Sequence, residues 1–244
     1  MKLRKLLLAL CALPLFAFAA DEGASKPPAN PDPWEPFNRK VFAFNDFADR
    51  WFLKPVAKGY DHVTPQFLED GIHNMFTNLS EVGDILNSLL QAKFKNGAVS
   101  SGRLVLNSTV GLLGFFDVAS KVGWQRHEED FGQTLGYWGV KPGPYIVVPF
   151  LGPRTVRDGF GNIADVYSDP LAYMDDVRTR NQLLGVRIID TRAQLLKAEE
   201  LMSGDRYIFI RDAYLQRRQF LINDGMVQDN FGGDDEDYDY DDQK

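Results

Sequence analysis

Aromatic and polar residues recur with helical spacing between Trp34 and Phe52. At 100° per residue, one face of this stretch is polar and the opposite face is apolar. The polar face carries Asn38, Arg39, Asn45, Asp46, Asp49 and Arg50, and the apolar face carries Phe37, Val41, Phe44, Phe47, Ala48, Trp51 and Phe52. Pro36 suits the first helical turn, where its missing N–H is not needed. The pattern predicts an amphipathic helix that ends ahead of Pro55.

Two environments fit this helix. Its apolar face either packs on a protein core, as in most amphipathic helices, or lies in a membrane interface, where Trp and Phe anchor at the depth of the lipid headgroups. Phenylalanine and tryptophan in place of leucine favour the membrane interface. The stretch by itself leaves both interpretations open.

Most of the remaining chain also has helical spacing of apolar residues. We expect further helices at 71–94, about 98–113, 154–167, 183–202 and 206–222. Between them we expect a loop at 56–70, a helix stop at Asn96-Gly97 and a bend into a short helix at 114–119. The sequence therefore predicts a mostly α protein.

Residues 131–153 differ from the rest because glycine and proline recur throughout them. These residues exclude a long uninterrupted helix. Tyr145 to Val148 has the composition of a short β-strand, too isolated to found a sheet. We therefore expect an irregular segment here.

The two ends of the chain have compositions of their own. Residues 1–19 have the charged start, the apolar run and the Ala17-Phe18-Ala19 cleavage pattern of a secretory signal peptide. Residues 20–33 are expected to form a flexible, proline-rich tether. Residues 225–244 are expected to form a disordered acidic tail. A helical domain over 34–224 remains between them.

The chemistry of the chain excludes several classes of protein. Its formal charge of −7 and the absence of a basic cluster argue against a nucleic-acid partner. His62, His73 and His127 have no metal-ligand spacing to one another, and the phosphate-, dinucleotide- and serine-nucleophile motifs are absent. His127-Glu128-Glu129-Asp130 is interpreted as a solvated acidic loop. We expect no metal, no cofactor and no catalytic residues.

One enzymatic alternative stays open, since serine triads assemble from distant positions. An envelope hydrolase acting on lipid or cell-wall polymer would need Ser100, Ser101 or Ser108 as nucleophile. His73 or His127 would be its base.

Several blocks resemble one known family. Asp32-Pro33-Trp34-Glu35-Pro36-Phe37-Asn38-Arg39, followed by Phe42-Ala43-Phe44-Asn45, is similar to the opening signature of the MlaA (VacJ) family. The further blocks, in family order, are Asn107 to Gly111 with Gly114 to Ala119, Asp130 to Gly136, Gly143-Pro144-Tyr145 with Val148-Pro149-Phe150, and Thr191-Arg192-Ala193. The resemblance covers about residues 32–222.

The resemblance implies a non-enzymatic role in outer-membrane lipid asymmetry. Proteins of this family form a ring of amphipathic helices in the inner leaflet of the Gram-negative outer membrane. A central channel lets mislocalised phospholipid descend from the outer leaflet, and a periplasmic lipid carrier takes it up. Family members associate with trimeric porins. Many are lipoproteins, but Leu10 and the apolar run after Cys11 fit a lipid-attachment site only in part, which favours cleavage near Ala20.

With the resemblance, the membrane interpretation of the first helix prevails. We expect Phe37, Phe44, Phe47, Trp51 and Phe52 at the membrane interface and the polar face toward the channel or the periplasm. Irregular backbone is tolerated at membrane depth only where it is buried in protein or lines a wet cavity. The residues expected along the lipid path are Asn45, Gly132, Gly136, Gly143 and Tyr145.

Overall fold

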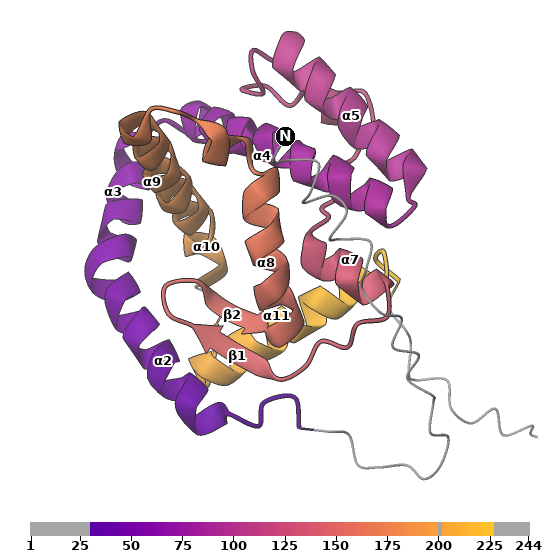
Figure 1. The fold of residues 1–244 in the computed structure, drawn as a ribbon. Helices are drawn as coiled ribbons and strands as arrows, with labels where there is room; N and C mark the ends of the chain where they lie inside the picture. The colour runs from indigo at the N-terminus through magenta and orange to yellow at the C-terminus, as the bar shows by residue number, and fades with distance from the viewer. Residues whose placement is uncertain (1–29, 200–201, 227–244) are drawn as a thin grey trace, which may run out of the picture. The chain divides into compact units, whose positions relative to one another are not determined.

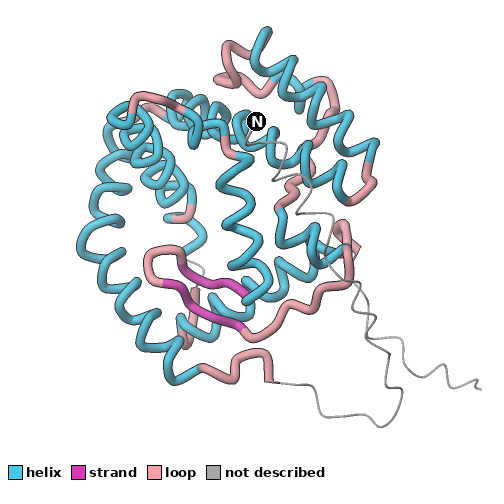
Figure 2. Tube along the Cα trace, viewed as in Figure 1, coloured by secondary structure: helices cyan, strands magenta, loops and turns pink. Residues whose placement is uncertain are grey.

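Helices account for most of the computed structural model (Figure 1). The structure describes residues 30–199 and 202–226. The expected signal peptide, most of the tether and most of the acidic tail therefore lie outside the described residues. Within the described part the mostly α class is confirmed, because its β structure is a single two-stranded sheet (Figure 2).

The elements follow one another with short connections. The α-helices are α2 (Glu35–Ala48), α3 (Lys54–Val63), α4 (Gln66–Leu90), α5 (Phe94–Thr109), α6 (Val118–Lys121), α7 (Phe131–Tyr137), α8 (Val156–Ser168), α9 (Val177–Gln194), α10 (Leu196–Glu199) and α11 (Arg206–Ile222). A π-helical turn, η1 (Asp49–Leu53), and a 3-10 turn, η2 (Pro170–Tyr173), complete the helical elements. The strands are β1 (Tyr145–Val148) and β2 (Gly152–Thr155).

The aromatic helix does not end ahead of Pro55, so that prediction is wrong. α2 continues through η1 directly into α3, and Pro55 lies in the first turn of α3. A first-turn position tolerates proline because its N–H would have no partner there, and the π-helical turn carries the backbone up to it. The expected loop at 56–70 is also wrong, since α3 fills its first half and α4 begins at Gln66.

α4 and α5 form an antiparallel pair joined by three residues (Figure 1). The chain reverses at Ala92, whose φ of 57° lies in the left-handed region. The expected helix stop at Asn96-Gly97 is wrong because both residues lie inside α5. The turn uses the conformation of Ala92 and does not use the glycine, which the helix pair buries.

A buried ion pair fastens α4 to α5. Arg103 and Glu81 are 2% and 0% exposed, and Arg103 Nε donates to Glu81 Oε1 at 2.6 Å. Arg103 Nη1 also donates to Ser120 Oγ of α6 at 2.9 Å. One guanidinium therefore connects three helices.

The expected strand at Tyr145–Val148 is confirmed, but it does found a small sheet. β2 pairs with it antiparallel, with Val148 opposite Gly152. A two-stranded hairpin alone is marginally stable in water. Asn38 of α2 supplies further support, because its Oδ1 accepts from Val147 N at 3.0 Å and its Nδ2 donates to Tyr145 O at 3.1 Å.

Among the remaining helices, α8 and α11 contact the hairpin through β2. The irregular character of 131–153 is only partly confirmed, because Asp130 caps α7 by accepting from Gln133 N at 2.8 Å. α7 crosses α8 closely, and a Cβ on Gly161 would lie 2.5 Å from Gly132 N. α8 and α11 match the predicted helices at 154–167 and 206–222 to within two residues. α9 starts at Val177, before the predicted 183, because Asp176 caps it.

Charged side chains hold the first helices to the C-terminal ones. Arg192 of α9 donates to both carboxylate oxygens of Asp49 at 2.7 and 2.8 Å, and to Glu199 at 2.6 Å. Burial opposes ionisation of Glu199, but hydrogen bonds from Lys54 and Arg192 outweigh it and lower its pKa to about 2. Figure 1 shows α3 and α9 side by side at this junction.

Replacing the buried guanidinium tests the α4–α5 connection. Arg103→Met should lower the free energy of unfolding by about 3–5 kcal/mol, because it leaves the Glu81 carboxylate buried without its cation. Denaturant unfolding of the detergent-solubilised protein measures the change. Arg50→Gln, which removes a half-exposed cation from a surface pair, is the control and should cost less than about 1 kcal/mol. Equal losses in the two variants would contradict the assignment.

Candidate functional site

The aromatic face of α2 and η1 points away from the protein interior. We use this name for Phe37, Phe44, Phe47, Trp51 and Phe52, which are 48–69% exposed. Phe44 stacks edge-on against Phe150 of the hairpin turn, with ring centroids 5.2 Å apart. Since water solvates such rings poorly, a contiguous set of them indicates a surface that contacts an apolar phase or a partner.

Other helices expose large apolar side chains in the same way. Examples on helices are Phe67, Leu86, Phe94, Val105, Phe160, Ile163 and Tyr167, and the turn after α5 adds Leu112 and Leu113. Among the described residues, no helix is both long and apolar enough to cross a bilayer. The helices α4, α5 and α8, which expose these apolar side chains, also bury polar ones.

The interior has the opposite composition. Among the described residues, nineteen polar or charged side chains are buried, against eight hydrophobic ones. Burying a polar group is costly unless it is hydrogen-bonded, and most buried groups here are, as with Asn38 and Arg103. The protein is thus polar inside and apolar over much of its surface, the reverse of an ordinary water-soluble domain.

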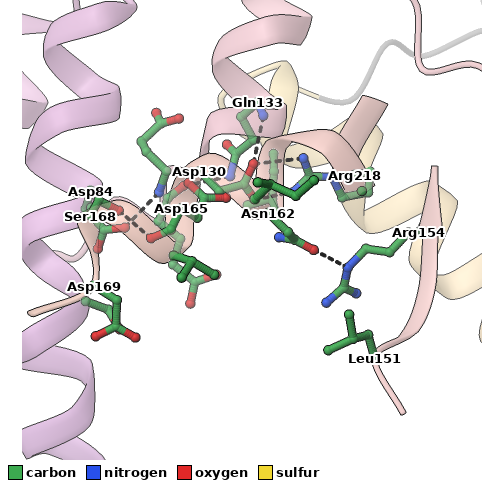
Figure 3. Close-up of a pocket in the computed structure, with 18 of the residues that line it drawn as sticks. Asp84, Asp130, Gln133, Leu151, Arg154, Asn162, Asp165, Ser168, Asp169 and Arg218 are labelled. Carbon is green, nitrogen blue, oxygen red and sulfur yellow. Dashed lines mark hydrogen bonds and ion pairs between the residues drawn. The ribbon is translucent and has the colours of Figure 1, made fainter. Parts of the chain in front are cut away.

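A cavity of about 1000 Å³ opens within this polar interior (Figure 3). α4, the segment before α7, the hairpin, α8, α9 and α11 contribute to its wall. The charged lining residues are Asp84, Arg126, Glu128, Glu129, Asp130, Arg154, Asp165, Asp169, Arg187, Arg217 and Arg218. The aliphatic lining residues are Leu79, Val148, Leu151, Ile163, Val166 and Leu221. We call it the polar cavity.

Asp84 of α4 forms one side of the polar cavity and is 3% exposed. Its Oδ2 accepts from Arg126 Nε at 3.0 Å, and its Oδ1 accepts from Glu129 N at 3.0 Å. Burial raises the pKa of Asp84 to about 7 although Arg126 and the backbone of Glu129 favour the carboxylate. This carboxyl group therefore changes charge near neutral pH.

Arg218 of α11 organises the opposite side. Its Nη2 donates to Asp130 at 3.0 Å (Figure 3), and its Nε donates to Asp158 at 3.0 Å. Tyr214 Oη donates to the same Asp158 at 2.7 Å. Burial opposes ionisation of Asp158, but the charge of Arg218 outweighs it and lowers its pKa. The network joins α7, α8 and α11.

A third wall is formed by α8 and its flanks. Asp165 Oδ1 accepts from Phe131 N at 2.9 Å, and burial raises the pKa of Asp165. Arg187 pairs with Asp169 at 2.7 Å. Charged and aliphatic groups thus meet in one cavity, an arrangement that can hold an amphipathic molecule by its polar and apolar parts.

None of the five residues predicted along the lipid path is among the described residues that line the polar cavity. Asn45 binds the hairpin turn, since its Nδ2 donates to Val148 O at 3.0 Å and its Oδ1 accepts from Phe150 N at 2.8 Å. Tyr145 is 1% exposed and packs on Tyr207. Both amides of the polar face of α2 thus bind the hairpin.

The three glycines have packing roles. A Cβ on Gly132 would lie 2.7 Å from Asp158 Oδ1 and 2.8 Å from Arg218 Nη2, so its hydrogen makes room for the charged network behind the cavity. A Cβ on Gly136 would lie 2.9 Å from Arg157 Nη1. Gly143 has a φ of 68°, which favours glycine.

Sequence reasoning missed the cavity and misjudged the loop before α7. Glu129 is 7% exposed and binds Gln91 at 2.7 Å and Lys93 at 2.8 Å, so this part of the loop is not solvated. Asp158, Asn162 and Asp165 recur at helical spacing within an otherwise apolar helix, and this polar stripe is the signal that could have indicated the cavity.

Several of the serine and histidine residues of the hydrolase alternative form hydrogen bonds with other groups. His73 contacts Asp190 at 2.9 Å, and this hydrogen bond raises its pKa. Ser101 donates to Gly97 O, and Ser108 accepts from Asn78. No hydrogen bond found among the described residues links Ser100, Ser101 or Ser108 to a histidine.

The buried carboxyl group of Asp84 predicts a pH dependence of stability. Because its pKa is raised in the folded state, the stability it contributes is present below about pH 4 and is lost as pH rises to about 7. As pH rises through this window, the free energy of unfolding of the unsubstituted protein should fall by about 1 kcal/mol per pH unit relative to that of Asp84→Asn. Urea titrations of both proteins at pH 4.5, 6 and 7.5 measure it, and parallel curves would contradict it.

Comparisons with known proteins identify relatives over most of the chain. The family model described as MlaA lipoprotein matches residues 30–221. The intermembrane phospholipid transport system lipoprotein MlaA of Escherichia coli is 37% identical over 234 residues, covering 93% of this chain and 92% of its own. The protein of the same name from Haemophilus influenzae is 34% identical and covers 93% of this chain and 94% of its own.

A solved structure agrees with these relatives. It comes from work on the structural basis for maintenance of bacterial outer membrane lipid asymmetry, and its sequence is 37% identical to this chain. The two structures superpose with a TM-score of 0.69 over 79% of this chain and 99% of the other. With a family model over most of the chain and relatives of this identity, the chain belongs to the MlaA lipoprotein family.

Proposed function

We propose that this protein acts in intermembrane phospholipid transport. It removes mislocalised phospholipid from the outer leaflet of the Gram-negative outer membrane and so maintains lipid asymmetry. The names of its relatives support this function. A periplasmic lipid carrier receives the phospholipid, and a trimeric porin is the neighbour in the membrane.

The observation that carries the proposal is the reversed polarity of the molecule. Exposed aromatic and aliphatic side chains are stable where acyl chains replace water, and buried charges are stable where they line a wet cavity. Amphipathic helices with exposed aromatic side chains, such as α2, suit an orientation along one leaflet, with the rings at the depth of the lipid headgroups. In this arrangement they form a ring around the polar cavity at the periplasmic face of the outer membrane.

The polar cavity is the passage for phospholipid. Its charged walls accommodate the headgroup, and aliphatic residues such as Leu151 and Val166 accommodate the start of the acyl chains. Three of the five residues expected along the lipid path support this passage indirectly. Asn45 and Tyr145 fix the hairpin, and Gly132 makes room for the network of Arg218.

Membrane retention does not depend on an acyl chain. One acyl chain gives only marginal membrane binding, while several buried aromatic side chains can retain a protein. The relatives are named lipoproteins, whereas Cys11 lies in a context that favours cleavage near Ala20. The aromatic face provides the retention in either case.

Charge on the aromatic face should release the protein from membranes. The double variant Phe44→Asp with Phe47→Asp removes two rings that are about half exposed. Each ring should contribute about 1–1.5 kcal/mol to the free energy of membrane binding. We therefore expect the membrane partition coefficient to fall roughly a hundredfold. Flotation with outer-membrane vesicles measures it. Asn181→Asp with Gln182→Asp adds the same charge at exposed polar positions of α9 and is the control.

A second pair of substitutions separates release from misfolding. Trp51→Asp with Phe52→Asp changes the more exposed rings of the aromatic face and should act in the same direction. Circular dichroism checks the helix content of each variant. If the variants are folded and remain bound to membranes, the prediction is wrong and the aromatic face packs on an internal core.

Photo-crosslinking tests the passage. A benzophenone side chain at Leu151, which lines the polar cavity, should label phospholipid well above the same group at the exposed Lys58 of α3. Groups at Gly136 and Tyr145 test the residues expected from the sequence beside it. Mass spectrometry of the purified adducts quantifies the labelled lipid. Labelling at Leu151 no greater than at Lys58 would exclude the cavity as the passage.

A further inference from the structure

The arginine side chains of the polar cavity differ in whether a carboxylate neutralises them. Its lining holds six carboxyl groups and five guanidinium groups, so it has no excess of cations to attract an anion. Four of the five arginines are paired with carboxylates, all of which line the cavity except Asp158. The pairs are Arg126 with Asp84 and Glu128, Arg187 with Asp169, Arg217 with Glu128, and Arg218 with Asp130 and Asp158.

Arg154 is the exception among the described lining residues, because no carboxylate lies within 4.0 Å of it. Its Nε donates to the neutral Asn162 Oδ1, and its Nη1 donates to Pro153 O at 2.7 Å. A guanidinium carries five N–H donors in a fixed fork. The others, on Nη1 and Nη2, have no partner among the described residues. Figure 3 shows this fork beside Leu151.

The backbone holds Arg154 in place. It lies in β2 opposite Ile146, half-buried, and Thr155 next to it caps α8. Asn162 extends from α8 and fixes the Nε edge of the guanidinium. Asn162 is therefore a positioning residue, and Arg154 presents its remaining donors in one direction without rearrangement.

A phosphodiester is the ligand that fits these properties. It carries one negative charge on two oxygens, and the guanidinium fork binds such a pair of oxygens in a bidentate way. The other arginines of the cavity already donate to carboxylates, which neutralise their charge and occupy part of each fork. The adjacent Leu151 offers an apolar contact on the same side.

We propose that Arg154 binds the phosphodiester of the phospholipid headgroup as the lipid passes through the polar cavity. This proposal rests on the proposed function and adds the residue by which the passage selects phospholipid over a neutral lipid with the same tails. A diacylglycerol lacks the phosphate and gains nothing from Arg154.

The test compares two photoreactive lipids in the detergent-purified protein. Phosphatidylglycerol and diacylglycerol with the same photoreactive acyl chain are titrated, and labelling of residues 156–168 is quantified by mass spectrometry. Arg154→Gln should weaken phosphatidylglycerol labelling about tenfold and leave diacylglycerol labelling unchanged. Arg154→Lys should lose less, because it keeps the charge without the fork.

Two charge-removing variants are compared with it. Arg50→Gln, on the exposed side of η1, should leave both labelling curves unchanged. Arg217→Gln, in the cavity but already paired, should weaken phosphatidylglycerol labelling less than Arg154→Gln does. An equal loss of phosphatidylglycerol labelling in Arg217→Gln and Arg154→Gln would overturn the proposal, because binding would then depend only on the total charge of the cavity. Equal loss of both lipids in Arg154→Gln would overturn it as a structural effect.

Inorganic phosphate distinguishes the source of the anion. Phosphate, added at the lipid concentration that saturates labelling, should not reduce labelling by phosphatidylglycerol. Complete loss of labelling would overturn the proposal in favour of a site for free anions. Failure of the proposed function looks different. In that case neither lipid labels residues 156–168 of the unsubstituted protein, whatever residue stands at position 154.

Discussion

A polar interior must supply its own hydrogen bonds, and most of this structure depends on that constraint. Asn38 satisfies the edge of a hairpin that two strands alone would not stabilise. Arg103 does the same for Glu81 between two long helices. Both side chains are buried, and Asn38 joins elements that lie more than a hundred residues apart in the sequence. Because an unpaired buried group costs more than a paired one contributes, these contacts select one arrangement of the helices.

The same constraint produces the cavity. Charged residues of α4, α8, α11 and the segment before α7 neutralise one another in pairs around it. Apolar side chains consequently turn outward, where the aromatic face and the sides of the other helices carry them. A polar passage inside an apolar exterior suits a molecule with a charged head and two hydrocarbon tails. The pairing also makes Arg154 distinct, since it is the cavity arginine that no carboxylate neutralises.

Sequence patterns predicted which helices and strand exist better than they predicted where each one ends or which element it packs against. The aromatic spacing of α2 indicated a surface rich in exposed rings, and the structure shows these rings exposed. Pro55 and Gly97 were misjudged because their effect depends on context: a π-helical turn leads into Pro55, and Ala92 makes the turn expected at Gly97. The strand at Tyr145 was predicted without its partner. The pairing needs the Phe150 turn and Asn45 from a helix about a hundred residues earlier.

The sequence by itself determined the helical class, the amphipathic character of the first helix and, through its motif blocks, the family. These properties are local, because periodicity and short motifs are written in adjacent residues. Only the tertiary structure decided which polar residues face the cavity. Asp84, Arg154 and Arg218 lie on three elements separated by more than sixty residues each, and nothing in their local spacing relates them. Their charges acquire a role only when folding places them around one space and pairs all but Arg154 with a neighbour.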